Sequence, residues 1–225
     1  SLRKELTMPS VLGTNVLAEV AGAITDFFEK LAGPEGTNWL MEFKKFLRKE
    51  SCWTKPTWME KDGVIHLSVT SYGTTGSQWI TRLEKKDFRL SKWAKDVLNS
   101  PNFKSTTGIT YNCVVLKGEF FSDEDRITSK IRAEADKRKF AKPNAEVACL
   151  IRENFSDEDI EAMGLIWLVT MHEPINDSGG AQNLLCAHRY GVVGRRLNAF
   201  YGYPSGRWRR VDGFVFLAPQ DQPSV

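Results

Sequence analysis

The stretch LIWLVTM, residues 165–171, decides how the second half of the chain folds, because it is a continuous apolar run of strand length directly after Gly164. Three further runs of strand length follow it, and turn sequences rich in Gly, Pro or Asn separate them. These runs span residues 183–189, 195–201 and 207–219. Short strands joined by such turns are typical of antiparallel hairpins. We therefore predict a C-terminal antiparallel β-meander of four strands.

Helical patterns dominate the chain before this meander, with predicted strands between them. Residues 64–70 alternate apolar and polar side chains, and residues 109–116 are rich in strand-forming residues. Thr75-Gly-Ser-Gln78 has the pattern of a capping box, and Ser91 precedes a short amphipathic stretch, so both indicate helix starts. Helices therefore concentrate early and strands late, which places the fold in the α+β class with a mixed middle segment.

Two apolar stripes at helical spacing precede the first predicted strand. The first covers residues 10–31 and stops at a Gly-Pro-Glu-Gly break. The second covers residues 38–50 and carries its basic residues on the side opposite to the apolar ones. We predict that residues 1–62 form a helical hairpin and linker, and that residues 63–225 form an α+β domain ending in the meander. One continuous domain is the alternative.

The pentapeptide FSDED occurs twice, at residues 121–125 and 155–159. A calcium-binding EF-hand loop needs oxygen ligands at alternate positions and a Gly at the sixth. Counted from the first Asp of each copy, the sixth positions hold Thr128 and Ala162, so neither copy fits. Ser followed by acidic residues is typical of a helix start, with Ser as the N-cap. Both copies are therefore predicted to cap helices, and neither is predicted to bind a metal.

The composition limits the class of protein. A chain of 225 residues with 41% hydrophobic and 26% charged residues is typical of soluble globular proteins, and its net charge of +3 is too small to indicate nucleic-acid binding by itself. The four cysteines lie far apart, which favours buried thiols in a reducing compartment over a zinc site. No apolar run approaches the roughly 18 residues of a membrane helix. We expect a cytoplasmic protein with no membrane segment, cofactor or metal.

Several segments resemble a known family. WLMEFKKFLRKESCW from Trp39, WLVTMHEPINDSGG from Trp167, LNAFYGYPSGRW and the closing FVFLAP are similar to a family of uncharacterised bacterial conserved hypothetical proteins. The resemblance covers most of the chain from Trp39 onward. In that family the turn after the EPI segment commonly reads Asp-Ser-Asp-Gly, whereas Gly179 replaces the second Asp here, which weakens a metal interpretation of this turn. The resemblance implies no activity.

Two histidines and a glutamate are the candidate catalytic residues. His172 and Glu173 end the first meander strand, and His188 ends the second. In a hairpin the end of one strand lies beside the start of the other, so His172 is expected near Asn183, and His188 near the start of the first strand. This geometry disfavours a metal centre made of all three residues. A hydrolase-type site near His172 and Glu173 stays as an alternative function.

The C-terminal part of the chain is rich in arginine and aromatic residues. From residue 165 onward there are six arginines and no lysine. Arginines for phosphates and aromatic rings for bases are typical of single-strand nucleic-acid surfaces. Strand alternation from Arg207 would place Arg196, Arg207 and Arg209 on an outer face, and would pack Trp208 against an inner face of Leu197, Ala199 and Tyr201. The candidate ligand-binding residues are Arg196, Arg207, Arg209, Trp208 and Tyr203.

The sequence favours a non-enzymatic protein-interaction or structural module, with a protein partner of unknown identity or self-association. The first alternative is binding of single-stranded nucleic acid or a phosphate ligand through the arginine and aromatic residues. The second alternative is the hydrolase-type enzyme.

Overall fold

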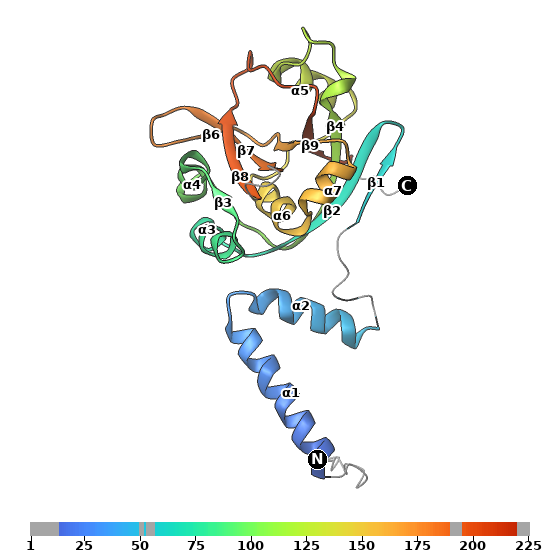
Figure 1. Ribbon diagram of the computed structural model, residues 1–225, viewed down its shortest axis with the longest axis vertical. Helices are drawn as coiled ribbons and strands as arrows, with labels where there is room; N and C mark the ends of the chain where they lie inside the picture. The colour runs from blue at the N-terminus through green and yellow to red at the C-terminus, as the bar shows by residue number, and fades with distance from the viewer. Residues whose placement is uncertain (1–13, 50–51, 53–56, 190–194, 220–225) are drawn as a thin grey trace, which may run out of the picture. The chain divides into compact units, whose positions relative to one another are not determined.

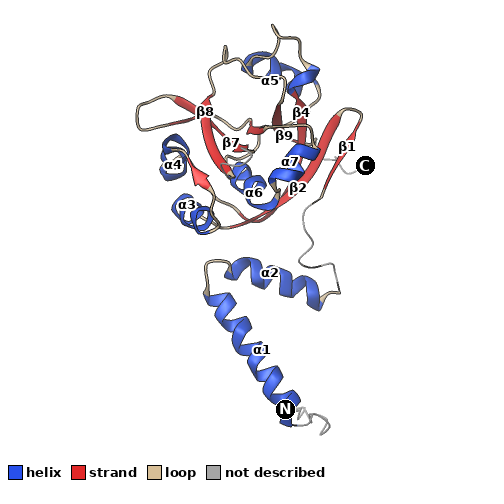
Figure 2. Cartoon of the chain, viewed as in Figure 1, coloured by secondary structure: helices blue, strands red, loops and turns tan. Residues whose placement is uncertain are grey.

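A computed structural model describes residues 14–49, 52, 57–189 and 195–219. The chain divides into two compact units, Ser1–Trp53 and Thr54–Val225. Helices and a mixed sheet together confirm the α+β class (Figure 2). Residue 62, the boundary predicted from the sequence, lies in the turn of a β-hairpin of the second unit.

The first unit is a helical hairpin, as predicted. Helix α1 (Thr14–Ala32) and helix α2 (Gly36–Leu47) diverge from the turn between them (Figure 1). The rings of Phe27 and Phe43 meet at 4.6 Å between centroids and join the two helices near the turn. None of the helices in the described residues is both long and apolar enough to cross a membrane.

The second unit is built on a nine-stranded sheet with the order β1-β2-β4-β9-β5-β7-β8-β3, and β6 pairs with β7 beside this path. The strands are β1 (Trp58–Lys61), β2 (Val64–Tyr72), β3 (Arg89–Leu90), β4 (Thr107–Lys117), β5 (Trp167–Thr170), β6 (Ile175–Asn176), β7 (Gln182–His188), β8 (Arg196–Tyr201) and β9 (Asp212–Leu217). The pairs β5–β9 and β3–β8 are parallel, and the other neighbours are antiparallel.

Helices cover both faces of this sheet. On one face lie α3 (Gly76–Lys85), α4 (Lys92–Asn99), α6 (Glu146–Asn154) and α7 (Asp157–Ala162), and their buried side chains form the larger hydrophobic cluster. On the other face, α5 (Thr128–Lys137) packs with Phe121 and Trp208 over a smaller cluster, and the short 3-10 helix η1 (Gly118–Phe120) precedes it in the chain. The alternating side chains of β2 and β4 contribute to both clusters.

The predicted four-stranded meander is wrong in one respect. Strands β5, β7 and β8 are antiparallel neighbours, but β9 does not pair with β8. Instead β9 lies between β4 and β5, antiparallel to the former and parallel to the latter. Burial explains this position: five of the six β9 residues are buried, whereas β8 alternates buried and partly exposed residues. A strand that is apolar on both sides belongs in the middle of a covered sheet.

Three cysteines are buried free thiols, as predicted. Cys113, Cys149 and Cys186 are all buried, and Cys52 is partly exposed. Burial raises the pKa of Cys113 to about 12, so this thiol stays protonated and unreactive near neutral pH.

The two FSDED copies have different structures. In the second copy, Ser156 caps α7 in a capping box with Asp159, which confirms the prediction. The prediction is wrong for the first copy, because α5 begins only at Thr128. There the Ser122 Oγ accepts from the Asp125 N at 3.2 Å within an isolated turn. The buried Arg126 follows this turn and donates to the main-chain oxygens of Gly118 and Phe121. The turn does not continue into a helix, because the chain is extended at Ile127, which forms an antiparallel bridge with Arg207.

We expect Ser156→Ala to lower the free energy of unfolding by about 0.5–2 kcal/mol, because it removes the cap of α7. Ser122→Ala is the matched control in the same pentapeptide, and its effect should be smaller, since its hydroxyl closes only an exposed turn. Urea denaturation of both variants measures the difference. Equal losses would show that the cap of α7 contributes no more than the turn.

Candidate functional site

The candidate catalytic residues do not form one site. His172 follows β5 and lies beside Leu185 of β7, while His188 pairs with Trp167 at the other end of β5. The hairpin therefore separates the two imidazoles, as its antiparallel geometry requires. Among the residues that the structure describes, no group of three or more His, Cys, Asp and Glu side chains could hold a metal ion.

The buried His172 ring holds the main chain in place. Its Nε2 accepts from the Leu185 N at 3.0 Å, so its Nδ1 carries the proton and donates to the Glu173 carbonyl oxygen at 2.6 Å. Burial lowers the pKa of His172 to about 4, and the ring is therefore neutral at physiological pH. With both nitrogens engaged, His172 is placed to position the segment after β5 and not to transfer protons.

A groove of about 570 Å³ lies next to Glu173, with α5 along one side. The Lys142 Nζ lies 2.7 Å from the Glu173 Oε1, and this hydrogen bond lowers the pKa of Glu173. Arg132 donates to the carbonyl oxygens of Met171 and His172 at 3.1 and 2.8 Å, so its guanidinium holds the groove wall. General acid–base catalysis needs a pKa near the working pH. A carboxylate kept ionised by a lysine gives the hydrolase alternative little support.

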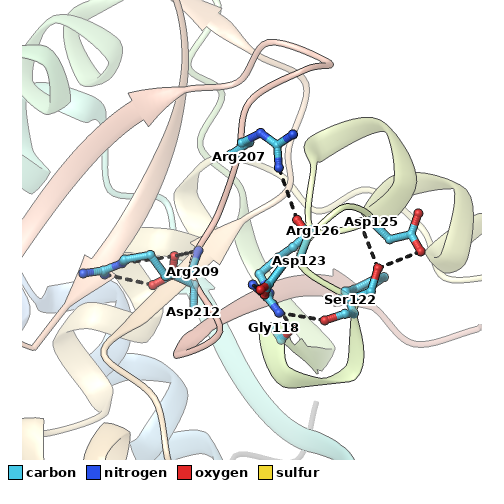
Figure 3. Close-up of polar contacts among 9 residues, drawn as sticks. Gly118, Ser122, Asp123, Asp125, Arg126, Arg207, Arg209 and Asp212 are labelled. Atoms are coloured by element: carbon cyan, nitrogen blue, oxygen red, sulfur yellow. Dashed lines mark hydrogen bonds and ion pairs between the residues drawn. The ribbon is translucent and has the colours of Figure 1, made fainter.

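The residues from Arg207 to Val211 do not form the predicted strand, because β9 starts only at Asp212. The main-chain N and the Nη2 of Arg209 both donate to the buried Asp212 carboxylate, at 2.8 and 2.9 Å (Figure 3). Arg207 is directed elsewhere, and its Nη1 donates to the Asp123 carbonyl oxygen at 3.3 Å (Figure 3). The buried Asp212 carboxylate requires hydrogen-bond donors. The hydrogen bonds that it accepts from Arg209 turn the chain between these two residues. The predicted shared outer face of Arg207 and Arg209 is therefore wrong.

Trp208 belongs to the protein core. Its side chain is buried next to Phe214, and its Nε1 donates to the Thr128 Oγ1 at 3.0 Å. Leu197 and Ala199 face the opposite side of the sheet, in the larger cluster. The prediction that Trp208 packs against these two residues is wrong, although their own inward orientation is confirmed.

Arg196 and Arg209 do come together, around His188. Arg196 lies opposite His188 in the β7–β8 register, and both arginines lower the pKa of His188, after burial, which is the largest cause. The Arg209 guanidinium lies 4.2 Å from the centre of the Trp167 ring, and the Phe200 ring lies 4.0 Å from it. These two groups already occupy the Trp167 ring, which leaves little of it for stacking on a base.

Tyr203, the remaining candidate, is 43% exposed and stacks on Tyr201 at 5.7 Å between ring centroids. Tyr201 was predicted on the inner face and is instead 55% exposed. The five candidate ligand-binding residues thus lie in several separate environments, and they do not form one continuous surface.

The N-terminal hairpin exposes large apolar side chains on both helices. In α1, Val20, Ile24 and Phe28 are 44%, 50% and 63% exposed, and their spacing of four residues puts them on one side of the helix. We call these three, with four residues of α2, the hairpin stripe. The α2 members are Leu40 (40%), Phe43 (38%), Phe46 (63%) and Leu47 (63%).

The sequence analysis placed these apolar residues on the two apolar stripes of the predicted hairpin and gave them no partner. The contact between α1 and α2 uses Phe27, and it leaves the neighbouring Phe28 exposed. The width of the apolar pattern indicates that some of these side chains stay exposed. Helix α1 has apolar residues at both positions 27 and 28, and one partner helix covers only one side of such a pattern.

No family model, no curated protein and no solved structure matches this chain. The resemblance to uncharacterised bacterial proteins therefore stays a prediction.

Proposed function

We propose that this protein is a non-enzymatic interaction module, and that its N-terminal hairpin binds a second copy of the same chain. The observation that carries the proposal is the hairpin stripe, which has members on both helices. Contiguous exposed apolar residues on a soluble protein usually mark an interaction site. Within the described residues of this unit, 14–49 and 52, α1 and α2 are the two helices, and neither covers this stripe.

A second copy suits this stripe because a two-fold symmetric interface uses the same residues on both sides. Two hairpins packed in this way form a four-helix bundle. The charges also fit. Helix α1 has a net charge of −2 from Glu19, Asp26, Glu29 and Lys30, whereas residues 36–49 have a net charge of +3 from Glu42, Lys44, Lys45, Arg48 and Lys49. Attraction is therefore strongest when α1 of one copy lies next to α2 of the other.

Sedimentation velocity over a range of concentrations should show a dimer of the full chain that Phe28→Ser/Phe46→Ser dissociates. Burying one Phe side chain contributes about 1.5–3 kcal/mol, and the double variant loses two in each copy. We expect its dissociation constant to rise at least a hundredfold. Met59→Ser is the matched control, since Met59 of β1 is also 63% exposed but lies in the second unit, and it should leave the dimer intact.

Two results would refute this function: a wild-type chain that is monomeric at every concentration, or a double variant that dimerises as the wild type does. The other functions have less support, because the groove at Glu173 holds an ionised carboxylate and the arginines are divided among separate partners. The buried free thiols support a cytoplasmic location as part of the same proposal.

A further inference from the structure

Within the described residues, four of the six residues of strand β8 have a paired strand on one side only. Strand β3 pairs with it only at Arg89↔Arg196 and Leu90↔Leu197. From Asn198 to Tyr201, β7 is the one paired neighbour of β8 within the described residues. The sheet therefore has an open edge beside the second half of β8.

The main-chain groups at this edge point outward. On the β3 side, the Ser91 N donates to the Leu197 carbonyl oxygen at 3.2 Å, so the polar groups of Leu197 face away from β7. Successive residues of a strand turn their N–H and C=O groups to alternate sides. Ala199 and Tyr201 therefore direct both groups to the open edge, where none of the described residues hydrogen-bonds to them.

An apolar cavity of about 150 Å³ lies next to these groups. Its lining residues are Trp93, Asn183, Asn198, Ala199, Phe200 and Tyr201. Trp93 comes from α4 and is 50% exposed, so the cavity opens to the surface. A cavity of this volume holds a group about the size of benzene, whereas sites for cofactors and drug-sized ligands measure about 300–1,000 Å³. The cavity therefore fits one apolar side chain.

We propose that the open edge of β8 binds an extended peptide segment of another protein by strand addition. The main-chain groups of Ala199 and Tyr201 would hydrogen-bond to the peptide backbone, and one apolar side chain of the peptide would enter the cavity. Charge selects the peptide further. The exposed Lys92 lies just after Ser91, where β3 leaves β8, so the peptide carries an acidic residue at that end. This surface and this partner are distinct from the hairpin and its second copy.

Selection from a phage-displayed library of short random peptides on the full-length protein provides the probe. Selected peptides should share an apolar residue among strand-forming residues, with an acidic residue at one end. Fluorescence polarisation then compares one selected peptide across variants. Ala199→Pro removes the outward N–H and leaves the hydrogen bonds to β7, which come from the alternate residues, so the dissociation constant should rise at least tenfold. Trp93→Ala removes a cavity wall and should also raise it at least tenfold.

Phe120→Ala is the control, because Phe120 of η1 is 55% exposed and does not line the cavity, and it should bind the peptide as the wild type does. A second measurement does not depend on the proline variant folding: peptide binding should slow hydrogen exchange of the Ala199 and Tyr201 amides at least tenfold. The proposal fails if no peptide is enriched above background, if Trp93→Ala binds normally, or if exchange at these amides does not change.

Discussion

Arg152→Met is expected to lower the free energy of unfolding by about 3–5 kcal/mol, the usual cost of removing one partner from a buried ion pair. The Arg152 side chain is fully buried between α6 and the sheet. Its Nη1 donates to the His188 carbonyl oxygen at 3.0 Å, and its Nη2 donates to that of Phe155 at 2.8 Å. The same Nη2 lies 3.0 Å from the Asp157 Oδ1 at the start of α7. Removal of the guanidinium leaves all three acceptors without this donor.

Urea denaturation at neutral pH measures this loss, with Arg189→Met as the matched control. Arg189 pairs with Glu161 at 2.9 Å, but the Glu161 side chain is 67% exposed, so loss of this pair should cost about 0–1 kcal/mol. The double variant Arg152→Met/Asp157→Asn should recover part of the loss, because it no longer leaves a carboxylate beside an apolar side chain. Similar losses for Arg152→Met and Arg189→Met would contradict the structural role assigned to Arg152.

Local patterns in the sequence predicted the elements that depend on local chemistry. The capping box of Thr75 and Gln78 and the cap by Ser91 are both present, because these side chains satisfy main-chain donors within three residues. The alternation of residues 64–70 predicted β2, whose odd-numbered apolar residues enter the larger cluster. In each case the interaction that fixes the element lies within the element or its immediate neighbours.

Other features depend on residues far apart in the chain, and the sequence did not reveal them. The β1–β2 hairpin is a local exception: Asp62-Gly63, both with positive φ, marks its turn, but its first strand is too exposed to show alternation. The position of β9 in the sheet depends on its pairing with β4 and β5, which lie far from it in the sequence. The first FSDED copy does not start a helix because the chain is extended at Ile127, which pairs with Arg207 far along the chain. Such contacts have no local pattern.

The candidate sites show the same difference between features set by local patterns and features set by distant contacts. The prediction that Arg207 and Arg209 share one face of a strand required a strand that starts at Arg207. The hydrogen bonds from Arg209 to Asp212 form a turn there instead, and β9 starts only at Asp212. Arg196 lies on the side of β8 opposite to Leu197 and Ala199, as simple alternation predicts, but that side carries the smaller cluster and is not an outer face. The open edge of β8 depends on how far β3 extends along it, which is a property of the sheet and not of either strand.

The stability of the protein is expected to fall by about 3 kcal/mol between pH 7 and pH 4 through His172 alone. The pKa of His172 is about 4 in the folded protein, against 6.5 for an exposed histidine, because the ring is buried. Each pKa unit corresponds to about 1.4 kcal/mol. Between these values the unfolded chain binds a proton that the folded protein does not, so stability falls as the pH decreases. The contribution is complete above about pH 6.5 and is lost by about pH 4.

His172→Gln tests this, since a glutamine oxygen can accept the Leu185 N–H but does not titrate. Urea denaturation at pH 7 and pH 4 should show that the variant loses about 3 kcal/mol less than the wild type over this range. The variant still loses stability through His188, whose pKa burial also lowers to about 4. His66→Gln is the control for the same substitution at a partly exposed histidine of β2. Equal losses for His172→Gln and the wild type would mean that the pKa of His172 is not lowered in the folded protein, which would contradict the burial of a neutral ring at this position.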